Sequence, residues 1–290
     1  MPTKIEKDAI SGQNTTGHEW DGVKELNTPL PKWWLYTFYV CIAWAFVLFL
    51  LYPSIPYGTG YFHGILGYSP RKEVDADVAK LVEQRKGSMD RIAASSFDAI
   101  KADPALMEVA LTSGRITFAE DCQPCHGAGG GGNPGYPALA AGAWLWGGTL
   151  ADIQQTVTHG IRSTDPDARQ SAMPHFGADG TLKPEEIEQV ASYVWATFYG
   201  HPATGEDVSA GAQIFADNCA ACHGEQGQGT REMGAPKLAS QIHLYGNSRD
   251  AIVRQVNLPR QGIMPNWGAR LSPATIKAVT LYVHSLGGGE

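Results

Sequence analysis

The chain has 290 residues, of which 43% are hydrophobic, and its formal net charge is −7. This length accommodates two domains of about 100 residues together with further segments. The negative charge argues against nucleic-acid binding, which requires a basic face. Four of the five cysteines form two close pairs, and the fifth, Cys41, lies in an apolar run as a small hydrophobic residue.

Residues 1–32 are polar and show no clear periodicity, so we interpret them as a short arm outside the membrane. Residues 33–52 then carry no charged side chain, and about 20 apolar residues are enough for a helix to cross the hydrocarbon core. Trp33, Trp34 and Tyr52 suit the aromatic belts at the two membrane surfaces. A signal peptide would have a shorter apolar region and a small-residue cleavage site. The sequence therefore predicts an uncleaved transmembrane helix over residues 33–52.

The basic residues around this span predict its orientation. Four lysines precede the span, whereas the first basic residue after it is Arg71. The positive-inside rule then places residues 1–32 in the cytoplasm as an N-terminal arm, and everything after residue 52 on the outer side of a bacterial inner membrane. Residues 53–104 are accordingly interpreted as a periplasmic linker, which ends in a helical spacer.

Residues 122–126 and 219–223 both read C-x-x-C-H, and the two copies lie 97 residues apart. This is the attachment signature of c-type haem, in which two thiols on one helical turn bond the porphyrin and the next histidine reaches the iron. A zinc ribbon would separate its cysteine pairs by about 15–20 residues, and a redox C-x-x-C would lie near a βαβ pattern. The sequence predicts two covalently bound haem c groups, with attachment at Cys122, Cys125, Cys219 and Cys222 and axial ligation by His126 and His223.

A low-spin haem iron needs a second axial ligand, and a methionine thioether opposite histidine raises its potential. Met173 and Met264 recur in register, each before a proline, 47 and 41 residues after the histidine of the same copy. Pairing within each copy would join His126 to Met173 and His223 to Met264, but a swap between the copies uses the same four residues and stays open. His175 and His243 are the alternative ligands.

The predicted fold class is all-α, with one transmembrane helix and two tandem class I cytochrome c-like domains, residues 105–204 and 205–290. Pro104, Pro184 and the pair Ser272-Pro273 suit the starts of helices. Residues 105–204 carry ten acidic and four basic side chains. This excess, which includes Asp165 and Asp167, favours the first domain as a docking face for a basic electron donor.

Several segments resemble one protein family over nearly the whole chain. Residues 19–34 (EWDGVKELNTPLPKWW), residues 52–56 (YPSIP), both C-x-x-C-H motifs and both Met-Pro pairs are similar to the dihaem subunit III of cbb3-type cytochrome c oxidases. The resemblance implies that the chain accepts electrons from a donor cytochrome c and passes them to the monohaem subunit. Oxygen is then reduced in the catalytic haem–copper subunit, so the resemblance implies no catalytic residue in this chain.

Two other functions are compatible with the motifs. A free-standing, membrane-anchored dihaem shuttle would carry the same haem sites but would not need the sequence that precedes the span. A dihaem peroxidase would need a sixth iron position that opens to peroxide, and a Met-Pro pair in both copies argues against this enzyme.

Overall fold

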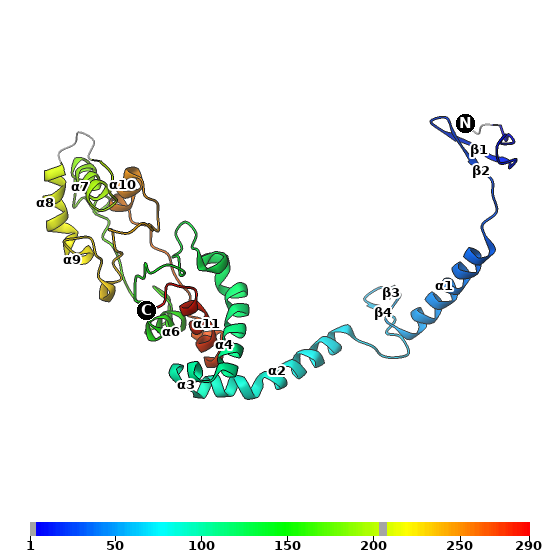
Figure 1. Ribbon diagram of the computed structural model, residues 1–290, viewed down its shortest axis with the longest axis horizontal. Coiled ribbons are helices and arrows are strands. Elements are labelled where there is room, and N and C mark those ends of the chain that lie inside the picture. Colours follow the sequence, from blue (N-terminus) through cyan, green and yellow to red (C-terminus); the bar gives the residue numbers. More distant parts are fainter. Residues whose placement is uncertain (1–3, 203–207) are drawn as a thin grey trace. The chain divides into compact units, whose positions relative to one another are not determined.

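A computed structural model describes residues 4–202 and 208–290 of the chain. The chain divides into two compact units, Met1–Val82 and Glu83–Glu290. Helices dominate both units (Figure 1), which confirms the predicted fold class.

A β-hairpin occupies the N-terminal arm, where the sequence analysis predicted no regular structure. Strands β1 (Thr15–Trp20) and β2 (Val23–Leu26) pair antiparallel, and Trp20 faces Val23 across the turn. The turn residues Asp21 and Gly22 have φ of 48° and 87°. Two successive positive φ values are what a two-residue hairpin turn requires, and Asp-Gly supplies them at low cost.

Helix α1 (Lys32–Leu51) corresponds to the predicted span of residues 33–52. Its mean hydropathy is 2.1 and none of its residues is buried within the chain, so its apolar surface is free to contact lipid. Among the described residues it is the one helix long and apolar enough to cross a membrane. A second small hairpin, β3 (Pro56–Tyr57) and β4 (Gly60–Tyr61), follows, and α2 (Pro70–Ala94) then continues into the second unit.

The second unit contains two helical cores. The elements of the first core are α3 (Phe97–Ala102), α4 (Pro104–Thr117), η1 (Phe118–Cys122), α5 (Gln123–His126), η2 (Ala128–Gly130), α6 (Leu150–His159), η4 (Trp267–Ala269) and α11 (Pro273–Ser285). Gly114 lets α4 cross α11 closely, because a Cβ there would lie 2.2 Å from the carbonyl oxygen of Ala278. The rings of Phe118 and Tyr282 pack beside this crossing, with centroids 5.4 Å apart.

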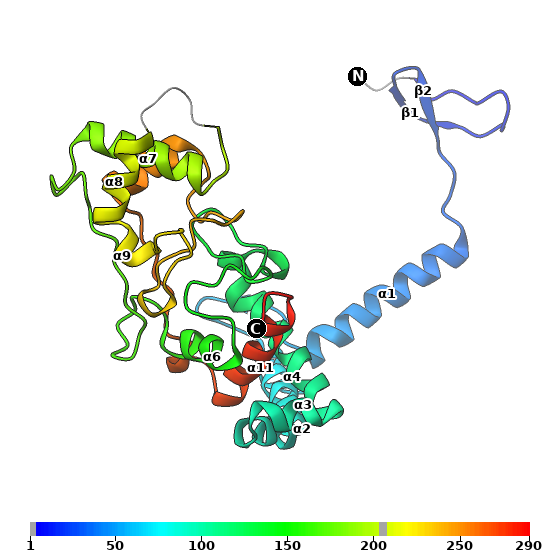
Figure 2. The same ribbon diagram turned by 60° about the vertical axis from the view of Figure 1, so that its left-hand side comes forward.

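The second core repeats this arrangement with α7 (Pro184–Thr197), α8 (Val208–Asn218), α9 (Ala220–His223), η3 (Arg231–Met233) and α10 (Arg249–Asn257). Gly211 lets α8 cross α7, since a Cβ there would lie 2.2 Å from the carbonyl oxygen of Gln189. The ring of Phe215 lies 5.5 Å from that of Tyr193. In Figure 2, α7 and α8 again lie together, as do α4 and α11.

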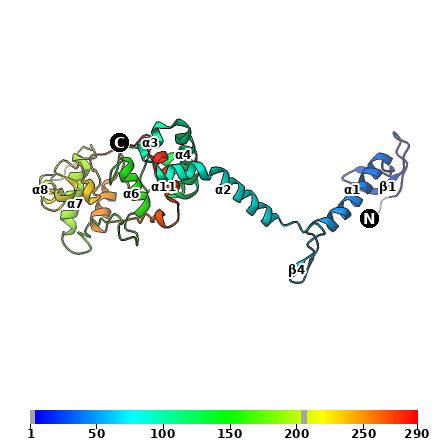
Figure 3. The same cartoon turned by 90° about the horizontal axis from the view of Figure 1, so that it is seen from below.

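The two cores are interleaved along the chain. The expected domains, residues 105–204 and 205–290, group α7 with α4 and α11 with α8. The packing differs, because α11 lies against α4 and α7 lies against α8 (Figure 3). The chain leaves the first core after α6, builds the whole second core, and returns to close the first core with α11. Either grouping is compatible with the sequence pattern. Both α7 and α11 place a tyrosine side chain and a backbone carbonyl against the glycine of the helix that crosses them.

The crossing glycines predict an unusual response to alanine. Exchanging a helical glycine for alanine normally stabilises a protein by about 0.4–1 kcal/mol. We expect Gly114→Ala and Gly211→Ala instead to lower the free energy of unfolding by about 1–3 kcal/mol, because the added methyl group would force the paired helices apart. Gly87→Ala in α2 is the control, since nothing lies within 4 Å of its position. Urea unfolding followed by circular dichroism measures all three, and stabilisation of either core variant would contradict the close crossings.

Candidate haem-binding sites

Both C-x-x-C-H motifs lie on a helical turn directly after a long helix. Helix α4 passes through the π-helical turn η1 to Cys122, and α5 carries Cys125 and His126. In the second copy, α8 leads to Cys219, and α9 carries Cys222 and His223. Both turns end at a glycine, Gly127 or Gly224, with φ of 77° or 76°. Each copy thus presents two thiols and a histidine on one short helical segment.

The histidine of each motif is fixed by a backbone carbonyl. Nδ1 of His126 lies 3.0 Å from the carbonyl oxygen of Pro137, and Nδ1 of His223 lies 3.0 Å from that of Pro236. A carbonyl can only accept, so Nδ1 carries the proton and Nε2 keeps its lone pair for a metal. Burial lowers the pKa of both histidines, and the hydrogen bond opposes this shift only in part. Both imidazoles are therefore neutral near pH 7, the form that binds iron.

A cavity of about 700 Å³, including its open part, lies beside His126. Its wall is apolar and comes from η1, α6, α11 and the loop before α6. It includes Phe118, Cys122, Leu139, Trp144, Trp146, Ile153, Val157, Val279 and Val283. Met264 lines the same cavity. The donor set and the apolar wall fit a haem with a histidine and a methionine ligand.

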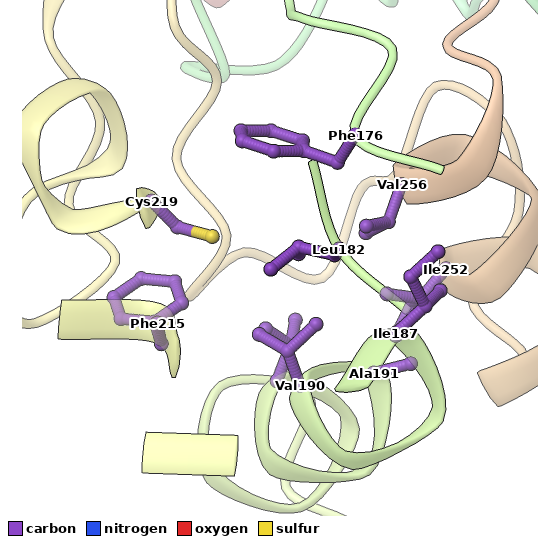
Figure 4. Packing of buried hydrophobic residues seen from close by; sticks show 10 residues of the cluster. Phe176, Leu182, Ile187, Val190, Ala191, Phe215, Cys219, Ile252 and Val256 are labelled. Carbon is purple, nitrogen blue, oxygen red and sulfur yellow. The ribbon is translucent and has the colours of Figure 1, made fainter. Parts of the chain in front are cut away.

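The second site has the corresponding apolar surroundings. Cys219 is buried in a cluster with Phe215 from α8, Val190 from α7 and Ile252 from α10 (Figure 4). Phe176 and Leu182, which follow the Met173-Pro174 pair, close the same cluster. Met173 packs against this cluster as well. The second site therefore brings Met173, rather than Met264, into the core that holds Cys219.

Each methionine thus lies in the core that holds the C-x-x-C-H motif of the other copy. The structure brings Met264 to the cavity of His126 and Met173 to the core of Cys219, which is the swap that the sequence left open. Ile161 and Met264 exchange two backbone hydrogen bonds of 3.0 Å, which hold the returning chain beside the first core. The exchange follows directly from the interleaved helices, because each Met-Pro pair precedes the helix that closes its core.

The other candidate ligands lie in different surroundings. The side chain of His175 is 46% exposed, and its Nδ1 lies 3.9 Å from Asp179. His243 stacks on Tyr199 with ring centroids 3.6 Å apart. Met233 is 48% exposed. An axial ligand must reach into an apolar core, and Met173 and Met264, which pack against the two buried clusters, meet this requirement better than the exposed His175 and Met233.

Two of the four motif thiols, those of Cys122 and Cys219, have a raised pKa because they are largely buried. Burial, assisted by the charges of Asp121 and Cys125, raises the pKa of Cys122 to about 12. Burial and the neighbouring Cys222 raise the pKa of Cys219 to about 11. A zinc site or a redox-active pair depends on thiolate, which burial disfavours. The two cysteine pairs also lie in different cores, Cys122 in the first and Cys219 in the second, which argues against one zinc ion held by both pairs.

The carboxylate of Asp165 is hydrogen-bonded to neighbouring residues and is not free at the surface. Its carboxylate accepts a hydrogen bond of 2.9 Å from the backbone N–H of Asp167 and lies 3.0 Å from Nδ1 of His159. These two contacts, in that order, lower the pKa of Asp165. In addition, three of the ten acidic residues counted for the first domain, Glu185, Glu186 and Glu188, lie on α7 in the second core. The acidic excess is therefore shared between the cores, and the sequence analysis missed the pair that His159 forms with Asp165.

Comparison with known proteins extends these observations over the chain. Residues 12–59 match the N-terminal domain of cytochrome oxidase-cbb3, FixP, and residues 109–194 and 206–283 match the cbb3-type cytochrome c oxidase subunit III family. The cbb3-type cytochrome c oxidase subunit FixP of Bradyrhizobium sp. (strain ORS 278) is 47% identical over 291 residues, which is 100% of both chains. Subunit CcoP of Cereibacter sphaeroides is 46% identical over 296 residues, again 100% of both. Subunit CcoP of Azospirillum sp. (strain B510) is 48% identical over 98% of each chain. With its haem motifs, its apolar helix and this full-length similarity, the chain belongs to the subunit III (FixP/CcoP) family of cbb3-type cytochrome c oxidases.

Proposed function

We propose that the chain is the dihaem electron-transfer subunit of a cbb3-type oxidase and carries one haem c in each core. In the first core, Cys122 and Cys125 attach the haem, and the axial ligands are His126 and Met264. In the second core, Cys219 and Cys222 attach the haem, and the axial ligands are His223 and Met173. The observation that carries this proposal is that each core combines a C-x-x-C-H turn, a carbonyl-oriented histidine and a methionine.

The haem supplies one-electron redox chemistry, and the chain supplies its ligands and its surroundings. Pro137 and Pro236 orient the imidazoles and keep their metal-binding nitrogens free. The methionine thioether raises the potential relative to two nitrogen ligands. The apolar wall beside His126 excludes water, which disfavours the more highly charged oxidised iron. The wall therefore also raises the haem potential.

The proposed electron route begins at a donor cytochrome c and continues through the two haems to the monohaem subunit and the catalytic haem–copper subunit. Both cores are placed outside the bacterial inner membrane, with residues 1–32 in the cytoplasm. Lys4, Lys7 and Lys24 before α1, together with Lys32 at its first residue, support this orientation. The part of the electron route outside this chain rests on the family to which the chain belongs.

Purification in a mild detergent tests the oxidase assignment against the alternative of a free-standing shuttle. We expect the chain to leave native membranes together with a haem–copper subunit and a monohaem subunit, since an electron-entry subunit must stay near its acceptor. A matched variant, in which α1 is exchanged for an unrelated apolar helix of equal length, is expected to stay in the membrane but to lose part of this association. Recovery of the unaltered chain alone, with both haems and without partners, would favour the shuttle.

A further inference from the structure

We propose that Arg162 is a positioning residue that holds the backbone before both axial methionines and thereby sets the strength of iron–methionine ligation at both haems. The proposal rests on the assignment of Met173 and Met264 as iron ligands. Arg162 would then link the ligation of the two haems, although the two methionines belong to different cores.

The guanidinium of Arg162 contacts both methionine segments. Its Nε donates a hydrogen bond of 2.7 Å to the carbonyl oxygen of Gly262, two residues before Met264. Its Nη1 donates to Ser171, two residues before Met173, with distances of 2.8 Å to Oγ and 3.3 Å to the carbonyl oxygen. The planar guanidinium offers several donors in fixed directions, so one side chain can hold two backbone segments in a defined relation.

The backbone around Arg162 adds to this connection. Arg162 directly follows Ile161, which pairs with Met264, and its own N–H donates 2.8 Å to the carbonyl oxygen of Arg169. The segment that enters the second core and the segment that returns from it are therefore joined at this point. A displacement of Arg162 would shift both segments.

Arg162 also occupies a backbone conformation that disfavours most side chains. Its φ is 52°, and among the described residues only Asp21, in the hairpin turn, shares a positive φ without being glycine. Such a conformation is strained for a residue with a Cβ and persists where the surrounding structure holds it in place. Glycine would adopt it without this strain, so the arginine at this position is explained by its side-chain contacts.

The second repeat contains a related contact. The register that aligns Val157 with Val256 places Gln261 at the position of Arg162. Nε2 of Gln261 donates a hydrogen bond of 3.2 Å to the carbonyl oxygen of Met173 itself. Each copy thus uses this position to hold the methionine segment of the other sequence copy, and of these two residues Arg162 donates side-chain hydrogen bonds to both segments.

The test uses imidazole, which competes with methionine for the sixth iron position. A hydrogen bond from a charged donor contributes about 1.5–3 kcal/mol, so loosening both segments is expected to raise the apparent imidazole affinity at least about tenfold at both haems. We would titrate imidazole into the oxidised, full-length dihaem chain carrying Arg162→Gly or Arg162→Lys. Glycine keeps the backbone conformation and removes the side chain. Lysine keeps the positive charge but lacks the planar guanidinium with its several N–H donors.

Arg115→Lys, an exposed arginine on α4, is the matched control and is expected to leave both affinities unchanged. Ser171→Ala is a milder variant that removes one acceptor, and we expect it to raise imidazole affinity only at the haem attached to Cys219. This variant also tests the proposal if Arg162→Gly fails to retain two haems. An effect of the Arg162 variants at one haem only, or at neither, would overturn the proposal.

The ligand assignment is tested separately by Met264→Leu and Met173→Leu. If these two variants leave the sulfur-to-iron absorbance intact, the assignment fails. If they abolish it while the Arg162 variants bind imidazole as the unaltered chain does, the role of Arg162 fails and the assignment stands.

Discussion

In a chain that carries only the His126 haem, replacement of Met264 by leucine is expected to abolish the sulfur-to-iron charge-transfer absorbance and to lower the haem potential. Met264 lines the cavity of His126, and leucine has no thioether to bind iron. Cys122 and Cys125 would still hold the ring, so the haem content should not change. Axial ligation and the surrounding protein set haem potentials over about 0.8 V, and we expect a fall on the order of 0.1 V or more. Absorbance spectra and redox titration measure both effects.

Met173→Leu in the same single-haem chain is the matched control. Because Met173 packs in the other core, we expect it to leave the absorbance and potential of the His126 haem unchanged. The background is made with Cys219→Ser and Cys222→Ser, which remove the second attachment site. If Met173→Leu abolished the absorbance of the His126 haem and Met264→Leu kept it, His126 would be paired with the methionine of its own copy. That result would contradict the interleaved arrangement.

Local features of the fold could be predicted because each depends on a few neighbouring residues. The sequence predicted helix starts at Pro104 and at Ser272-Pro273, and the structure confirms both. Pro104 is the first residue of α4, and Ser272 caps α11 through a hydrogen bond to the N–H of Thr275. The apolar span is similarly local, since about 20 uncharged residues suffice to indicate it. Motif spacing likewise places each histidine directly beside its cysteines.

The association of the helices could not be predicted in the same way. Gly114 crosses α11 and Gly211 crosses α7, yet both closing helices place a tyrosine at the crossing, Tyr282 or Tyr193. Each glycine could therefore pack against either closing helix, and the local sequence pattern does not distinguish the two arrangements. The outcome depends on contacts between distant segments, such as those of Ile161 with Met264 and of Arg162 with Ser171 and Gly262. Such contacts leave no periodic signal in the sequence.

The hairpin in the N-terminal arm had a signal that the sequence analysis did not use. Asp-Gly between two short segments with Trp20 and Val23 at their ends is a strong indication of a two-residue turn. The arm was interpreted from its polarity and its lack of helical periodicity, and neither property excludes a short two-stranded sheet. The structure adds β1 and β2 to the arm.

Replacement of Cys122 and Cys125 by serine is expected to remove one of two covalent haems per chain and to destabilise the first core. The haem would occupy the apolar cavity beside His126, whose wall includes Phe118 and Val279, and without it these apolar side chains would face water. The second core has its own buried cluster, and its proposed ligands His223 and Met173 are unaffected by the change. We therefore expect half of the covalent haem to remain, with its sulfur-to-iron absorbance retained.

Covalent haem is measured after acid–acetone extraction, which removes any haem that is not bonded to cysteine. Cys41→Ser is the matched control, because Cys41 is exposed on α1 and lies in neither motif, so two haems per chain should remain. Because α11 belongs to the first core although it ends the chain, limited proteolysis of the double variant should cleave α4 and α11 before α7 and α8. Loss of both haems, or protection of α11 together with α8, would show that the second core depends on the first or that the helices are grouped by sequence copy.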